Sequence, residues 1–180
     1  MLGFVRDLVY AQVFGANQYT DAFFVAFKIP NFLRRLFGEG AFATAFVPVL
    51  TEYKTQRSAA ELAAFVDKIA GTLGAVLLLV TLAGMAAAPL VVSLFAIGWV
   101  VDGEQEKLAL AAEMLQLTFP YLLFISLTAL AGGILNAHDR FAVPAFTPVI
   151  LNLVLIASAL WLAPQLDTPV VAMAWGVLLA

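Results

Sequence analysis

The chain has 180 residues, of which 63% are hydrophobic and only 12% are charged, with a formal net charge of -3. A soluble domain carries about 25% charged residues, so this composition cannot cover a water-exposed surface and lipid must surround most of the chain. Because the sequence contains no cysteine and His138 is its single histidine, a disulfide framework and a cysteine nucleophile are excluded, and a histidine metal centre is not expected.

Six hydrophobic segments follow one another along the chain, and a membrane-spanning helix needs about 20 mostly apolar residues. The sequence therefore predicts an all-α, polytopic transmembrane helix bundle of about six helices, the first and last truncated. The predicted spans are residues 1–14, 19–56, 60–87, 105–136, 142–163 and 168–180. We expect the chain to be part of a longer protein.

The second segment, residues 19–56, is too long for one straight helix. Pro30, the Gly38/Gly40 pair and Pro48 are the predicted breaks within it, because a proline removes one helix hydrogen bond and its ring clashes with the preceding turn. An interrupted or bent second helix with a hinge is therefore expected.

The connections between the spans alternate in charge. Those after the second and fourth spans are basic, and those after the third and fifth, WVVDGEQEK and APQLDTP, are acidic; the basic residues are Lys54, Arg57, Lys68 and Arg140. By the positive-inside rule, the basic connections and the N-terminus are predicted to lie in the cytoplasm and the acidic connections outside.

Seven ionisable residues lie inside apolar segments, two in the first span and five in the stretch DAFFVAFKIPNFLRRLFGEGAF: Arg6, Asp7, Asp21, Lys28, Arg34, Arg35 and Glu39. A charge at the bilayer centre costs about 2.5–3.5 kcal/mol on insertion scales, so these side chains must pair, reach an interface or line a water-filled cavity. Arg6 and Asp7 are adjacent and are expected on different helix faces. Asp21 and Lys28 are seven apart, too far for direct pairing along one helix.

Two arginines in a lipid-walled cavity favour an anionic substrate. Arg6 and Arg34 would offer planar guanidiniums to one ligand, and a guanidinium binds phosphate through paired hydrogen bonds. Asp21, Lys28, Arg35 and Glu39 are assigned to gating or to the cavity charge. The alternative is a purely structural role, with salt bridges joining Arg6 to Asp7 and Asp21 to Lys28.

Two stretches, GFVRDLVYAQVFGA and TDAFFVAFKIPNFLRRLFGEGAFATAFVPVLTEYK, closely resemble the amino-terminal signature of the MviN/MurJ family of bacterial lipid II flippases. FPYLLFISLTALAGGILNAHDRFAVPAFTPVILN resembles the fourth and fifth helices of that family. The resemblance covers nearly the whole chain. It implies part of the N-terminal lobe of a two-lobed, fourteen-helix membrane transporter.

The resemblance implies a transporter rather than an enzyme. Such a flippase moves lipid II, an undecaprenyl-diphosphate-linked disaccharide-pentapeptide, across the bacterial inner membrane by alternating access. It implies that Arg6 and Arg34 hold the diphosphate near Asp7, that Asp21 is a required charge, and that Arg35 and Glu39 lie near the cytoplasmic gate. Membrane lipids and the peptidoglycan synthesis and division machinery are expected partners; no cofactor, metal or nucleic acid is expected.

Two other functions stay open. A drug or cation exporter of the same superfamily would favour carboxylates in its cavity, whereas the arginines here point to an anion. A membrane enzyme acting on polyprenyl phosphates would need an acid/base or metal-binding cluster. The carboxylates of this sequence are scattered, and its single histidine lies in a predicted loop.

Overall fold

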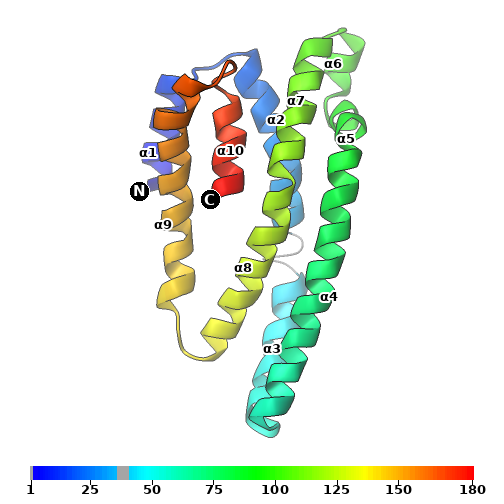
Figure 1. Cartoon of the computed structure of the whole chain (residues 1–180), viewed down its shortest axis with the longest axis vertical. Helices are drawn as coiled ribbons and strands as arrows, with labels where there is room; N and C mark the ends of the chain where they lie inside the picture. Colours follow the sequence, from blue (N-terminus) through cyan, green and yellow to red (C-terminus); the bar gives the residue numbers. More distant parts are fainter. Residues whose placement is uncertain (1, 36–40) are drawn as a thin grey trace.

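The computed structural model of the chain describes residues 2–35 and 41–180. Within these ranges the chain forms an elongated bundle of helices without β-strands (Figure 1), which confirms the predicted all-α class. The helices are α1 (Leu2–Val13), α2 (Gln18–Arg34), α3 (Ala41–Gln56), α4 (Ala59–Ala86), α5 (Ala88–Phe95), α6 (Ile97–Val101), α7 (Gln105–Thr118), α8 (Pro120–Ala137), α9 (Ala142–Ala157), the π-helical turn η2 (Ser158–Leu162), the 3-10 turn η3 (Ala163–Gln165) and α10 (Val171–Leu179).

Three helical stretches of the described chain are long and apolar enough to cross a membrane. They are Ala59–Ala86, Gln105–Ala137 and Ala142–Gln165, which coincide with the predicted third, fourth and fifth spans. The second of them bends between α7 and α8, where Pro120 occupies the first turn of α8, a position that tolerates proline because the N–H there has no helical acceptor.

Two helices of the described chain, α2 and α3, lie in the region of the second predicted span, and neither is broken at its proline. The α-helix continues through Pro30 to Arg34, and Pro48 likewise lies inside α3, so the interruptions predicted at these residues are wrong. Pro30 is fully buried, and α2 packs closely on α7, so tertiary contacts offset the lost hydrogen bond. The predicted Gly38-Glu39-Gly40 break lies outside the described residues.

Two helices, α5 and α6, occupy residues for which the sequence analysis predicted no span. Ala87 ends α4 and begins α5: its N–H donates to the Ala83 carbonyl, and its carbonyl accepts from Val91. Residues 88–95 therefore form a helix rather than a loop: α5 follows α4 directly and buries Ala88 and Val92 against α7.

The connections divide between two ends of the bundle (Figure 1). The α3–α4 and α8–α9 connections lie at one end, and the α1–α2, α6–α7 and η3–α10 connections lie at the other. Basic connections therefore gather at one end and acidic ones at the other. Lys54 lies within α3, and its ammonium donates to the carbonyl of Ala137 at the C-terminus of α8, where a cation also interacts favourably with the helix dipole.

Candidate functional site

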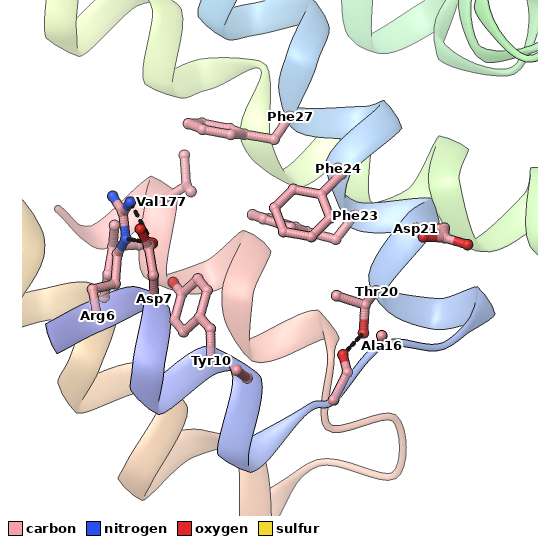
Figure 2. Close-up of a pocket in the computed structure, with 13 residues that line it drawn as sticks. Arg6, Asp7, Tyr10, Ala16, Thr20, Asp21, Phe23, Phe24, Phe27 and Val177 are labelled. Atoms are coloured by element: carbon pink, nitrogen blue, oxygen red, sulfur yellow. Dashed lines mark hydrogen bonds and ion pairs between the residues drawn. The ribbon is translucent and has the colours of Figure 1, made fainter. Parts of the chain in front are cut away.

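A cavity of about 360 Å³ lies between α1 and α2, with α9 and α10 contributing Leu155 and Val177 to its lining (Figure 2). The connection between the two helices is a short fixed turn. Asn17 caps α2 by accepting hydrogen bonds from the backbone N–H groups of Tyr19 and Thr20, and Gly15 adopts a left-handed φ of 66°. Because α1 packs on α9 and η2 rather than on α2 in the described chain, the two helices diverge and leave this space.

The two walls of the cavity differ in chemistry. Arg6, Asp7 and Tyr10 line it from α1. From α2 it is lined by Thr20 and Asp21 in the first turn and then by three phenylalanines: Phe23, Phe24 and Phe27. Phe23 is buried and its ring stacks on that of Phe27 at 5.6 Å between centroids. The polar wall therefore faces an aromatic one, which lowers the local dielectric and strengthens any electrostatic interaction made there.

Arg6 and Asp7 form an ion pair with each other. Nη2 and Nε of Arg6 lie 2.7 Å and 2.9 Å from Oδ1 of Asp7, although adjacent residues were expected on different helix faces. The long arginine side chain folds back far enough to meet its neighbour (Figure 2). The salt bridge that the sequence left as an alternative is therefore present, with 31% of the Arg6 side chain and 63% of the Asp7 side chain exposed.

Asp21 pairs with Lys107 on α7 and not with Lys28, the partner in the alternative structural interpretation. The Asp21 carboxylate lies 3.9 Å from the Lys107 ammonium, which also lies 3.1 Å from Glu104 and 4.2 Å from the centroid of the Trp99 ring. Asp21 needed a partner on another helix, as its spacing predicted. The sequence analysis missed Lys107, although its i,i+3 spacing from Glu104 in an acidic connection was a usable signal.

The other predicted site residues do not line this cavity. Arg34 is half-buried near the end of α2, and its Nε donates to Oδ1 of Asn31 at 3.1 Å. Lys28 is exposed on α2, Arg35 is exposed at the C-cap of α2, and Glu39 lies outside the described residues. The structure thus brings Arg6, Asp7 and Asp21 to one cavity, and the expected convergence of Arg6 with Arg34 is not seen there.

A metal centre has no support in the described ranges, where no group of three or more His, Cys, Asp or Glu side chains is placed to hold an ion. The cavity instead combines one guanidinium, two carboxylates, a threonine hydroxyl and a phenol with aromatic side chains. Such a lining suits a large ligand that has both polar and apolar parts.

Comparisons with known proteins identify the family of the chain. The family model "Lipid II flippase MurJ" matches residues 10–180. The "Lipid II flippase MurJ" of Burkholderia cenocepacia is 48% identical over 176 residues, which cover 98% of this chain and 34% of that protein. The "Probable lipid II flippase MurJ" of Haemophilus influenzae is 45% identical over 184 residues, which cover 99% of this chain and 36% of that protein.

A solved structure, "Lipid II flippase MurJ, inward closed conformation", superposes with a TM-score of 0.78 at 32% identity and covers 99% of this chain and 37% of that one. The chain therefore spans about a third of the length of the relatives that it matches. The family model covers most of the chain, and the fold agrees with it. The chain belongs to the MurJ lipid II flippase family.

Proposed function

We propose that residues 1–180 are part of the N-terminal lobe of a lipid II flippase, and that the cavity between α1 and α2 receives the diphosphate of the lipid as it crosses the inner membrane by alternating access. The observation that carries this proposal is Arg6, the one basic residue among the described residues that line the cavity, whose guanidinium lies opposite the aromatic side chains of α2. A guanidinium in apolar surroundings attracts a diphosphate more strongly than it would in water.

Asp7 balances the charge of Arg6. An unpaired arginine within an apolar segment costs about 2.5–3.5 kcal/mol on insertion scales, and the ion pair with Asp7 offsets that cost. A diphosphate offers more negative charge and more acceptor oxygens than one carboxylate. We therefore expect the headgroup to displace Asp7 from Arg6.

Arg34 is proposed as a second ligand of the headgroup, further along α2. It follows Phe27, the last α2 residue of the cavity, by seven positions or roughly 10 Å of helix. A disaccharide-pentapeptide diphosphate extends well beyond a cavity of about 360 Å³, so one substrate could contact both arginines. Asp21, Lys28, Arg35 and Glu39 remain proposed as gating or cavity charges.

The basic end of the bundle is proposed to face the cytoplasm. In this orientation α1 runs from the cytoplasmic side towards the outside of the membrane. The separation of basic and acidic connections between the two ends supports this orientation. In the full-length protein, an impermeant thiol reagent added from outside should label a cysteine at Asp102 and not one at Arg57. Labelling of the cysteine at position 57 alone would show that the orientation is the opposite of the proposed one. Membrane lipids and the peptidoglycan synthesis and division machinery are the proposed partners.

The experiment that tests this function is complementation by the full-length gene in cells depleted of their own lipid II flippase. Arg6→Ala should abolish growth, and Arg6→Lys should impair it clearly because lysine keeps the charge but loses the planar fork. The same order is expected for Arg34. Arg57→Ala is the control: its side chain is 57% exposed and pairs only with Glu61, at 3.7 Å, among the described carboxylates.

A double variant separates substrate binding from charge balance. If Arg6 served only to neutralise Asp7, then Arg6→Ala combined with Asp7→Ala would restore growth. If Arg6 holds the headgroup, the double variant stays inactive while the protein accumulates in the membrane, as an immunoblot would show. Normal growth with Arg6→Ala alone, or its rescue by Asp7→Ala, would contradict the proposed function.

A further inference from the structure

Tyr10 carries a hydroxyl that the headgroup site described so far does not use. The hydroxyl oxygen is buried and makes no hydrogen bond within the described chain. Its ring lines the same cavity as Arg6 and Asp7 (Figure 2) and packs edge-on against Phe14 at 5.6 Å between centroids. Buried polar groups are nearly always hydrogen-bonded, so an unpaired hydroxyl with a fixed ring calls for a partner in another state of the site.

Asp7 is the natural partner. Asp7 and Tyr10 are three residues apart on α1, a spacing that places two side chains on one helix face. Both hydrogen bonds from Arg6 go to Oδ1 of Asp7. In this state Arg6 balances the charge of the carboxylate, and the hydroxyl of Tyr10 makes no hydrogen bond within the described chain.

Binding of an anion at Arg6 changes this balance. When the guanidinium turns to a ligand, the Asp7 carboxylate loses its cation, and an unpaired charge within an apolar membrane segment is unfavourable. A hydroxyl donor one helical turn away would lower that penalty, because hydrogen bonds to a charged acceptor are stronger than neutral ones.

We propose that Tyr10 is a positioning residue for an exchange of partners: when a diphosphate takes Arg6 from Asp7, the Tyr10 hydroxyl donates a hydrogen bond to the released Asp7 carboxylate. This inference rests on the proposed function, in which Arg6 receives the headgroup of lipid II. Tyr10 does not contact the ligand; it makes the release of Arg6 less unfavourable.

The test measures binding of undecaprenyl diphosphate to the full-length protein in lipid nanodiscs, for wild type, Tyr10→Phe, Asp7→Asn and the double variant. Tyr10→Phe keeps the ring and its contact with Phe14, and should bind the probe about tenfold more weakly. In the Asp7→Asn background, where no carboxylate is released, Tyr10→Phe should have no effect. Tyr19→Phe, an exposed tyrosine of α2, is the matched control and should bind like wild type.

Each result has one meaning. Wild-type affinity of Tyr10→Phe, or an equal loss in the Asp7→Asn background, would overturn the exchange. The midpoint of thermal unfolding without ligand should stay unchanged or rise, since the hydroxyl has no partner then; a fall would show a structural bond and contradict the inference. Wild-type affinity of Arg6→Ala would instead contradict the headgroup site itself, so the two failures are distinguishable.

Discussion

Two regions of the bundle are packed in opposite ways, although both are built from apolar helices. On the packed side, where α4 meets the junction of α7 and α8, a Cβ added to Gly84 would collide with the buried ring of Phe119. On the side of α1, charged and aromatic side chains surround a cavity instead. The difference teaches that small residues let helices close on each other, whereas long polar side chains in an apolar segment keep a space that a ligand can fill.

The largest expected effect lies on the packed side. Gly84→Ala forces a methyl group against Phe119, which is only 3% exposed and has no room to move, so the free energy of unfolding should fall by about 1–3 kcal/mol. Gly74→Ala on the same helix is the control, because nothing lies within 4 Å of its added Cβ. Denaturant unfolding of the full-length protein in detergent measures both. An equal change in the free energy of unfolding for the two substitutions would contradict the close packing inferred at Gly84.

A smaller effect is expected where the two sides are joined. Lys107 on α7 connects to Asp21 on α2 and stacks over Trp99, and only 13% of its side chain is exposed. Lys107→Met keeps the apolar stem and removes the charge, so the free energy of unfolding should fall by about 1 kcal/mol, a value limited by the exposure of Asp21. Lys68→Met, on an exposed position of α4, should change it little. Equal stability of the two variants would show that the contact of Lys107 with α2 does not stabilise the bundle.

The parts of the fold that depend on apolar length could be predicted from sequence. The span predicted at residues 60–87 is observed as Ala59–Ala86, because a long run of apolar residues has few alternatives to a helix in lipid. The continuation of α2 through Pro30 could not be predicted, since it depends on packing against α7. The short helices α5 and α6 were missed because neither is long enough to give a span signal.

The candidate site was predictable in its residue types more than in its pairings. Charges in an apolar segment must be satisfied, which singled out Arg6, Asp7 and Asp21. The partner of Asp21 is Lys107, far away in sequence, and only the fold brings the two together. The unpaired hydroxyl of Tyr10 could not be predicted for the same reason. The sequence shows a tyrosine in an apolar helix, and only the fold shows that its hydroxyl is buried without a hydrogen bond.

Photocrosslinking tests the central claim, that the headgroup of the lipid enters the cavity between α1 and α2, most directly. A photoreactive phenylalanine analogue would replace either Phe24, which lines the cavity and is 56% exposed, or Phe95 of α5 on the opposite side of the bundle (Figure 1), which is 61% exposed. With lipid II labelled on its pentapeptide and the full-length protein in membranes, position 24 should crosslink strongly and position 95 weakly. Equal crosslinking at the two positions, or crosslinking at position 95 alone, would contradict the account.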